Sequence, residues 1–587
     1  MGHGPIDHLQ ISRARFAIVA LAGAVTIVAG TIGGIIYDRE YEHCKEHFMG
    51  PLYHSLQMLI LHTPHYEHEM NIWLEIGRWA GLVTAFSAAA VLVGKRLRRE
   101  WMRVRASFWS GHVVVCGLGK KGLEVVQCIS KTMSVRHIVV IDPAPEPALA
   151  DACIAAGACL ITGDASQAEV LKEARVTKAQ AVVVITPSDE VNVRIAAEVR
   201  SACVAANAAT RCHVHLSDIY LRDALGTWVE QSGKPGAGRL HFFDVFDSEA
   251  RRVLQEHPMD GGGIANDSPT SVHVVILGFG RMGRSLALRA AKMGHFANGK
   301  LLRISAIDRD ATTQKERFLF RHPAMSSGRI CDLQFHPTEA ESEQTRKLFT
   351  EWMAEPDTLL HVFVTLDDDA RGLELALRLN AIAAGKKNVK ILVRLRSEHS
   401  LAPILEATDG STDRLVHFGM PERACSDGAF QTGELDRLAK AIHEAHVQRC
   451  IATTSRRPET DPALRSWDEL REDIRESNRQ QADHLCVKLR AINCALVESG
   501  GPDGLTSLSE ADVETLSPVE HARWNAERWL AGWRYGTPGD KPLRISPYLV
   551  RWDELDTSIQ DYDRNAVRQI PDMLKVTMSS KKIVRRA

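Results

Sequence analysis

The feature that most constrains this chain is an uncharged apolar stretch near its beginning. Residues Phe16–Tyr37 read FAIVALAGAVTIVAGTIGGIIY, without a single charged side chain. As a helix that rises 1.5 Å per residue, it would extend about 33 Å, enough to cross the hydrocarbon core of a bilayer. It is too long for a signal peptide, and no small-residue cleavage site stands out after it. We therefore expect a transmembrane helix, with Gly30 and Gly34 spaced so that another helix can pack closely.

A second apolar segment, Ile72–Val93, carries only two charged side chains, Glu75 and Arg78, which are spaced to pair near its start. Basic residues flank the two segments: Arg13, Arg15, Lys95, Arg96, Arg98, Arg99, Arg103 and Arg105. Because basic flanks stay on the cytoplasmic side, we expect a hairpin in the inner (plasma) membrane with both termini cytoplasmic and residues 38–71 external. The alternative is that the second segment is a buried helix of a soluble domain.

The composition of the whole chain hides this apolar part. The 587 residues (65.0 kDa) suggest about three or four domains, and a mean hydropathy of −0.15 excludes a protein with many spans. With 72 basic and 73 acidic residues the net charge is −1, so no overall field favours nucleic acid. The 12 cysteines form no CxxC pair, which indicates buried thiols in a reducing compartment and neither a zinc nor a redox site.

The external loop contains a short apolar stretch, Pro51–Leu61, followed by HTPHYE. The order of the segments is a span, a short helix, a polar stretch and a second span. This layout resembles the pore of two-span potassium-type cation channels. The resemblance implies a pore helix and filter from Tyr53 to Tyr66, with the filter positions Thr63, Pro64, His65 and Tyr66. Potassium filters use glycines to stack backbone carbonyls, whereas Pro64 and His65 stand here in place of Val-Gly. A monovalent cation is therefore the expected partner, with its identity open. The His and Glu residues around the stretch are interpreted as a solvated mouth, with metal binding or pH sensing as the alternative.

His112–Cys116 is a short apolar strand that leads into the glycine loop Gly117-Leu118-Gly119-Lys120-Lys121-Gly122 and then into a helical pattern. A second strand, His137–Ile141, ends in Asp142, 25 positions after the first glycine. In such a unit the glycines bring the backbone and a helix N-terminus to a pyrophosphate. The acidic residue accepts hydrogen bonds from a ribose diol and repels a 2′-phosphate. The sequence therefore predicts a site for NAD(H) or an adenine nucleotide (ATP or ADP) in preference to NADP.

The next residues, CLITGDASQAEVLKEARVTKAQAVVVITPSDEVNVRIA, contain two more strands, followed by Gly163-Asp164 and by Thr186-Pro187-Ser188-Asp189. This pattern resembles the RCK domain, also called TrkA-N, which regulates conductance in potassium channels and transporters. The resemblance extends to about residue 200, and Phe242–His257 resembles the family's helical end. It implies a ligand over the glycine loop, in contact with Gly117, Gly119, Lys120, Gly122, Asp142, Asp164 and Thr186.

After a breaker-rich linker, Asp260–Ser271, the pattern repeats. Strands are expected at 272–277, 302–307, 361–365 and 390–395, and the second set of ligand residues is Gly278, Gly280, Arg281, Gly283 and Asp308. CDLQFHP stands where Gly-Asp-Ala is expected, and Asp367-Asp368-Asp369 replaces Pro-Ser-Asp. The second copy is therefore expected to bind a different ligand or none.

A Rossmann fold always raises the possibility of an NAD-dependent enzyme. No separate substrate domain lies between the two copies, and no His, Lys or Tyr constellation suggests a proton donor. We therefore predict no catalytic residues and no enzyme activity.

The C-terminal part begins with a helical pattern at residues 466–497 and continues into an aromatic-rich stretch. The segments SPVEHARWNAERWLAGWRYG and PYLVRWDELDTSIQDYDRNAVRQIPDML resemble the ryanodine-receptor repeat, or RyR domain. Aromatic rings beside arginine suit a nucleotide or another anionic ring ligand. The candidate ligand residues are Trp524, Arg528, Trp533, Tyr535 and Arg564. The alternative is an aromatic core with surface salt bridges.

The sequence thus predicts an α/β protein of four parts. These are a two-helix transmembrane hairpin with a re-entrant pore helix (1–105), two Rossmann-like RCK domains (106–260 and 272–455), and a mainly helical part with the RyR domain (464–587). RCK domains of the family form rings under tetrameric pores, so the resemblance implies a homotetramer in which a regulatory nucleotide controls cation flow. The RyR domain would sense a further ligand or partner. The main alternative is a non-conducting, membrane-anchored nucleotide sensor.

Overall fold

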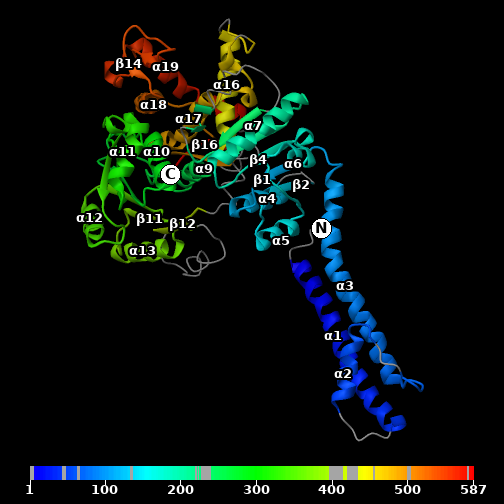
Figure 1. Ribbon diagram of the computed structural model, residues 1–587. Helices are drawn as coiled ribbons and strands as arrows, with labels where there is room; N and C mark the ends of the chain where they lie inside the picture. The colour runs from blue at the N-terminus through cyan, green and yellow to red at the C-terminus, as the bar shows by residue number, and fades with distance from the viewer. Residues whose placement is uncertain are drawn as a thin grey trace. The chain divides into compact units, whose positions relative to one another are not determined.

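The computed structural model describes most of the chain, in two compact units. The described residues are 6–42, 48–62, 66–132, 137–218, 221–222, 224–225, 239–395, 414–419, 434–453, 456–459, 461–498, 504–577 and 581–586. The first unit is Met1–Phe108 and the second is Trp109–Ala587. Figure 1 labels many of their helices and strands.

The described residues of the first unit form two long helices and one short helix (Figure 1). α1 spans Ile6–Tyr37 and continues as a π-helical turn over Asp38–Glu42, α2 spans Met49–Met58, and α3 spans Ile72–Ala106. Within the described part of the chain, Val19–Tyr41 is the one helical stretch long and apolar enough to cross a membrane. The second predicted span is helical throughout, but that it crosses a membrane stays a prediction.

Glycines let the three helices of this unit pack at close range. A Cβ atom at Gly30 would lie 2.8 Å from the Cβ of Ser55 in α2, and one at Gly34 would lie 2.8 Å from the Cβ of Pro51. A Cβ atom at Gly77 in α3 would lie 2.8 Å from the backbone nitrogen of Gly30. Larger side chains do not fit at such distances. The predicted packing role of Gly30 and Gly34 is therefore confirmed.

The second unit contains two six-stranded parallel sheets with equivalent strand orders. The first is ordered β3-β2-β1-β4-β5-β6, and the second, read in the same sense, is β9-β8-β7-β10-β11-β12. This is the strand order of a doubly wound Rossmann fold, which places ligands at the carboxyl ends of the strands where the order reverses. The predicted α/β fold with two Rossmann-like copies is confirmed.

The predicted strands and helices of the two copies are present with small shifts at their ends. The first copy contains β1 (Val113–Cys116), α4 (Lys120–Thr132), β2 (Ile138–Asp142), α5 (Pro147–Ala155), β3 (Cys159–Thr162), α6 (Ala168–Glu173), β4 (Ala181–Val184), α7 (Asp189–Ala205), β5 (Arg211–His215), β6 (Arg239–Phe243) and α9 (Val245–Glu256). The second copy contains β7 (Ser271–Leu277), α10 (Arg281–Met293), β8 (Leu302–Asp308), α11 (Ala311–Arg321), β9 (Cys331–Pro337), α12 (Glu343–Ala354), β10 (Thr358–Val364), α13 (Asp369–Ile382), β11 (Val389–Arg394) and β12 (Leu415–Phe418). The described cysteines carry free thiols and are buried, apart from the half-buried Cys486, as predicted.

The C-terminal part is mainly helical. α16 (Glu434–Thr453) precedes it, and it contains α17 (Glu472–Ala491), β13 (Cys494–Glu498), α18 (Glu510–Leu530), β14 (Arg534–Tyr535), β15 (Ile545–Ser546), α19 (Thr557–Arg568), α20 (Ile570–Thr577) and β16 (Lys581–Arg585). The helix predicted for residues 466–497 is interrupted, because Asn493 adopts a φ of +55° and the next residues form β13, antiparallel to β16. The end of that prediction was therefore wrong.

The linker between the two copies is held by α17. The Asp260 carboxylate accepts hydrogen bonds from the Arg490 guanidinium at 2.8 and 2.7 Å. Gly263 has a φ of +119°, and a Cβ atom there would lie 2.2 Å from the carbonyl oxygen of Arg490. The left-handed backbone and the lack of space both require glycine at this position. The breaker-rich linker is thus a fixed element of the second unit.

Buried ion pairs join the second copy to the C-terminal part. Arg289 on α10 pairs with Asp247 of α9 at 2.6 Å and with Glu476 of α17 at 2.9 Å. Further along α17, Lys488 pairs with Glu520 of α18. Charges in such surroundings are tolerated only when they are paired. The C-terminal part is therefore fastened to α10, the helix that follows the second glycine loop.

Candidate functional site

The first glycine loop joins β1 to α4 and is shaped by its first and last glycines. Gly117 has a φ of +107°, and a Cβ atom there would lie 2.8 Å from the carbonyl oxygen of Ile185. A Cβ atom at Gly122 would lie 2.0 Å from the carbonyl oxygen of Gly117. At Gly119, by contrast, a Cβ atom would meet nothing within 4 Å. Gly117 and Gly122 therefore build the loop, whereas Gly119 faces open space.

Asp142, the last residue of β2, holds this loop. Its Oδ2 accepts a hydrogen bond from the Leu118 N–H at 2.7 Å, and its Oδ1 accepts one from the Ala144 N–H at 2.9 Å. An ionised carboxylate offers about four acceptor positions, so these two bonds leave others for the hydroxyls of a ligand. The residue predicted for the ribose thus has a second role, which is to fix the backbone of the loop.

Asp164 and Thr186 follow the strands on either side of this site. The Gly163 N–H donates to the Asp142 carbonyl oxygen at 3.1 Å, which brings the residues after β3 to the end of β2. The hydrogen bond from the Ser166 N–H to Asp164 (2.8 Å) lowers the pKa of Asp164, so this carboxyl is ionised at neutral pH. Thr186 follows β4, and Lys120 is exposed at the start of α4. The structure thus brings the predicted residues together at the carboxyl edge of the four strands β1 to β4.

A buried amide that sequence reasoning missed positions Thr186. The Oδ1 atom of Asn192 accepts hydrogen bonds from the Thr186 N–H (2.9 Å) and hydroxyl (2.7 Å). Its Nδ2 donates to the carbonyl oxygens of Thr186 (3.1 Å) and His215 (2.9 Å). Asn192 is fully buried on α7. The only signal in the sequence was a polar residue on the face of α7 that packs on the sheet.

The second glycine loop repeats this geometry. The Phe279 N–H donates to Oδ2 of Asp308 at 2.7 Å, and the Asp310 N–H donates to Oδ1 at 2.8 Å. Gly278 has a φ of +96°, and a Cβ atom at Gly283 would lie 2.3 Å from the carbonyl oxygen of Gly278. Gly280 faces open space as Gly119 does, and Arg281 is exposed at the start of α10. Both loops therefore have the same backbone, held by an equivalent aspartate.

The strand register shows which residues differ between the copies. Pro337 pairs with Asp308 as Thr162 pairs with Asp142, so Thr338-Glu339-Ala340 occupies the place of Gly163-Asp164-Ala165. The segment CDLQFHP, which was expected to follow the third strand of the second copy, is that strand itself, β9. Its predicted place after the strand was therefore wrong. Glu339 thus stands in the place of Asp164, and its Oε1 atom lies 3.6 Å from Nη1 of Arg309.

On the other side of the second loop, the second copy lacks counterparts of Thr186 and Asn192, the hydrogen-bonded polar pair of the first copy. Cys116 pairs with Val184 as Leu277 pairs with Val364. Leu366 therefore stands in the place of Thr186 and Gly372 in the place of Asn192, while Asp367-Asp368-Asp369 replaces Pro-Ser-Asp as the sequence indicates. An apolar side chain thus replaces a hydroxyl at this edge, which makes the two sites chemically different.

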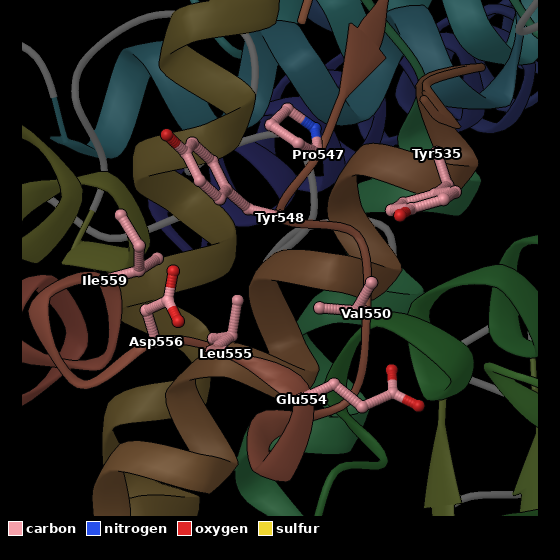
Figure 2. Close-up of a pocket in the computed structure, with 8 residues that line it drawn as sticks. All are labelled: Tyr535, Pro547, Tyr548, Val550, Glu554, Leu555, Asp556 and Ile559. Carbon is pink, nitrogen blue, oxygen red and sulfur yellow. The ribbon is translucent and has the colours of Figure 1, made fainter. Parts of the chain in front are cut away.

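The candidate residues of the C-terminal part fall into separate groups. The guanidinium of Arg528 lies 5.5 Å from the ring of Trp524 and 5.1 Å from that of Trp533. Arg564 instead lies over Trp552 at 5.4 Å and pairs with Glu514 at 2.7 Å. Tyr535 lines a cavity to which none of these other candidates contributes (Figure 2). The structure therefore brings together Trp524, Arg528 and Trp533 and places Tyr535 and Arg564 elsewhere.

The pore candidates are described only in part. Thr63, Pro64 and His65 lie outside the described residues, whereas the ring of Tyr66 lies 4.8 Å from that of Tyr37 at the end of α1. The predicted pore helix is α2, and its Ser55 hydroxyl lies 3.0 Å from that of Thr31 in α1. Glu75 and Arg78 pair at 3.7 Å, as their spacing predicts. Among the described residues no group of three or more His, Cys, Asp or Glu side chains could hold a metal ion.

Comparison with known proteins identifies part of the second unit. Residues 113–224, which contain β1 to β5, match the TrkA-N domain family. No curated protein matches the chain. The crystal structure of GsuK bound to ADP is 16% identical to it, covers 71% of this chain and 97% of that one, and has a TM-score of 0.35. The GsuK channel bound to NAD is 13% identical, covers 71% and 83%, and has a TM-score of 0.36. An NADPH-dependent quinone oxidoreductase from Escherichia coli is 17% identical, covers 42% and 83%, and has a TM-score of 0.18. The first Rossmann-like copy therefore contains a TrkA-N domain.

Proposed function

We propose that this protein is a two-span, potassium-channel-like membrane protein in which NAD(H), ATP or ADP binds at the first glycine loop and controls a cation pore. The observation that carries the proposal is the loop of the TrkA-N domain, where open space at Gly119 adjoins the backbone that Asp142 holds. The second copy takes a different ligand or none, because Leu366 and Glu339 stand where the first copy has Thr186 and Asp164.

The chemistry of the loop supports a pyrophosphate ligand with a free ribose diol. The first N–H groups of α4 have no partner within the helix, and a helix N-terminus of this kind favours a phosphate. Lys120 adds a positive charge in the first turn. The ionised Asp142 carboxylate has acceptor positions left for a diol, and its charge would repel a 2′-phosphate. NAD(H), ATP and ADP are therefore favoured over NADP.

The first unit supplies the proposed pore. Val19–Tyr41 and α3 would be the two spans, and α2, packed on α1 through Gly30 and Gly34, would be the re-entrant pore helix. Both termini would be cytoplasmic. Residues 63–66 would form the filter, and since that segment contains no glycine, the permeant monovalent cation is left open.

The coupling of ligand to pore is proposed to run through the short connection between the units. α3 ends at Ala106 and β1 begins at Val113, so a displaced β1 would pull on the second span. Four chains with two Rossmann-like copies each would make a ring of eight. A nucleotide that binds one ring conformation more tightly would shift the population toward it. The C-terminal part, which resembles the RyR domain, would act as a further sensor through its contacts with α10.

The second candidate is a membrane-anchored nucleotide sensor that does not conduct. Pro64 and His65, in place of the glycine-containing filter of potassium channels, favour it. Ion flux into proteoliposomes that contain the purified full chain distinguishes the two. Nucleotide-dependent flux of K⁺, Na⁺ or Cs⁺ supports the channel. Nucleotide binding without flux of any of these cations would leave only the sensor, and absence of nucleotide binding would contradict both.

A further inference from the structure

The C-terminal part contains a cavity of about 520 Å³, which lies within the size range of small-molecule sites. Its walls are formed by Tyr535, Pro547, Tyr548, Val550, Glu554, Leu555, Asp556 and Ile559. Figure 2 shows Val550 and Leu555 below the space between the two tyrosine rings, with the Asp556 carboxylate on the side of Tyr548. Of the five residues that suggest an anionic ligand, Tyr535 lines this space, whereas Arg564 and the arginine–tryptophan group around Arg528 do not.

The charges at the wall of the cavity are all negative. Residues 504–577 are described without a gap, and of those that line the cavity only Glu554 and Asp556 are ionisable acids while none is basic. Of the basic residues nearest in sequence, Arg551 pairs with Asp553 at 3.1 Å and Arg544 donates to the Ala531 carbonyl oxygen at 2.6 Å. Arg534 precedes Tyr535 and does not line the cavity. A ligand that carries phosphate or carboxylate would meet two like charges here.

The two carboxylates are available to a ligand to different degrees. One oxygen of Glu554 accepts a hydrogen bond from the Arg551 N–H at 3.0 Å. Asp556 stands at the N-cap position of α19, but its side chain makes no capping hydrogen bond. Its charge is therefore directed neither to an arginine nor to the helix, and it is exposed at the cavity.

The tyrosine rings provide the complementary apolar surface. Tyr535 is 57% exposed and Tyr548 is 44% exposed, so both rings present accessible surface at the cavity. The face of an aromatic ring attracts a cation, and the attraction is larger where the cation is partly desolvated. Two ring faces, two carboxylates and the aliphatic side chains of Val550, Leu555 and Ile559 match a cation that carries hydrocarbon.

We propose that this cavity binds a small organic cation, an ammonium or a guanidinium compound. This proposal rests on the proposed sensor role of the C-terminal part and names the class of ligand that this part would sense. It does not depend on the nucleotide site at the first glycine loop.

Calorimetric titration of the purified full chain tests the proposal with two cations, choline and agmatine, and with 3,3-dimethylbutan-1-ol, the neutral isostere of choline. At least one cation should bind with one site per chain, and the neutral isostere should not. Asp556→Asn, which keeps the size and the N-cap preference of the side chain, should weaken cation binding about tenfold, or about 1.4 kcal/mol. Asp553→Asn is the matched control, because Asp553 precedes the same helix, pairs with Arg551 and does not line the cavity.

Several results would overturn the proposal. These are no binding of either cation, equal binding of the neutral isostere, or the same loss in Asp553→Asn as in Asp556→Asn. Binding of a capped arginine amide but of neither free cation would assign the cavity to a peptide side chain instead. Nucleotide titration of Asp556→Asn separates the two sites: the nucleotide affinity should be unchanged, and a thermal unfolding curve like that of the wild type shows that the variant is folded.

Discussion

The carboxylate of Asp142 accepts a hydrogen bond from the backbone N–H of Leu118 at 2.7 Å, and Asp308 does the same for Phe279 at 2.7 Å. In both copies the acidic residue at the end of the second strand thus fixes the shape of the glycine loop. In the proposed function the same carboxylate meets the ribose, so phosphate binding and ribose recognition would both depend on one side chain. Changes at Asp142 therefore alter the loop and the diol site together.

The first prediction concerns the charge of Asp142. Asp142→Asn keeps an oxygen that can accept one N–H but removes the charge that disfavours a 2′-phosphate. We expect NAD(H) affinity to fall about tenfold or more, by at least about 1.4 kcal/mol, and the preference for NAD(H) over NADP(H) to narrow. Calorimetric titration with both dinucleotides measures this. Asp332→Asn, on the exposed edge of β9, is the control and should change neither affinity; an unaltered preference in Asp142→Asn would remove this residue from the ribose site.

The second prediction separates the roles of two glycines in one loop. In Gly119→Ala the new Cβ enters open space, so the fold should be kept while the methyl group obstructs a phosphate. In Gly122→Ala the new Cβ would lie 2.0 Å from a carbonyl oxygen, so α4 must shift. Overpacking of this kind costs about 1–3 kcal/mol. Nucleotide titration and thermal unfolding of both variants measure the two effects. Wild-type nucleotide affinity in a folded Gly119→Ala variant would argue against a ligand at this loop.

The third prediction concerns the buried ion pair between Lys488 of α17 and Glu520 of α18, within the C-terminal part. Lys488 and Glu520 are 2% and 3% exposed, and Glu520 also accepts a hydrogen bond from Arg523 at 2.8 Å. Removing Glu520 leaves Lys488 buried without its carboxylate partner, and removing Lys488 leaves Glu520 with Arg523 as its remaining partner. Breaking a buried pair in this way costs up to about 3–5 kcal/mol. Lys488→Met and Glu520→Gln should each lower the free energy of unfolding by such an amount, and the double variant should lose at least about 1 kcal/mol less than the sum. Denaturant unfolding of all four proteins gives the coupling, and strictly additive losses would mean that the pair does not contribute.

The fourth prediction concerns pH. Burial raises the pKa of Asp244 to about 7, although Lys121 and Arg222 oppose this shift and Asp247 adds to it. The neighbouring His215, 3.9 Å away, stays neutral because burial lowers its pKa to about 3. Between about pH 4 and 7 the folded chain therefore holds a proton at Asp244 that the unfolded chain has released, and stability falls as the pH rises.

Asp244→Asn should remove this dependence. Asparagine can still accept the N–H of Phe246 at the start of α9, a bond of 2.9 Å in the wild type. The variant should match the wild type near pH 4.5 and exceed it in unfolding free energy at pH 8. Denaturant unfolding at both pH values checks this. A variant that is less stable than the wild type at pH 8 would show that the ionised carboxylate is stabilised in the fold.

The strands and glycine loops could be predicted because their signals are local. β1 is four consecutive apolar residues with both faces covered, and Gly117, which follows it, has a positive φ that favours glycine. β9 was misplaced because its buried and exposed residues alternate irregularly and it ends in Pro337. Asn192 was missed because a single polar residue on a helix gives no periodic signal. Asn192 can hold Thr186 and His215 only in the folded chain, where the ends of β4 and β5 lie beside it.

The features of the C-terminal part depend on contacts between distant segments. Arg289 and Glu476 are paired although 187 positions separate them, and nothing in either local pattern indicates the partner. The cavity at Tyr535 and Asp556 forms because β14 pairs with β15 and a short 3₁₀ turn at Trp552–Glu554 precedes α19. The sequence drew attention to the aromatic residues, but which of them share a surface depends on this folding.

The most direct test of the account is planar-bilayer recording of the purified full chain with and without NAD(H), ATP or ADP, beside the Gly119→Ala variant. We predict cation currents whose open probability changes when at least one of these nucleotides is added, and a folded variant whose currents no longer respond to that nucleotide. Currents that respond equally in the wild type and in Gly119→Ala would contradict control by the first glycine loop. Absence of current under every nucleotide would contradict the channel itself.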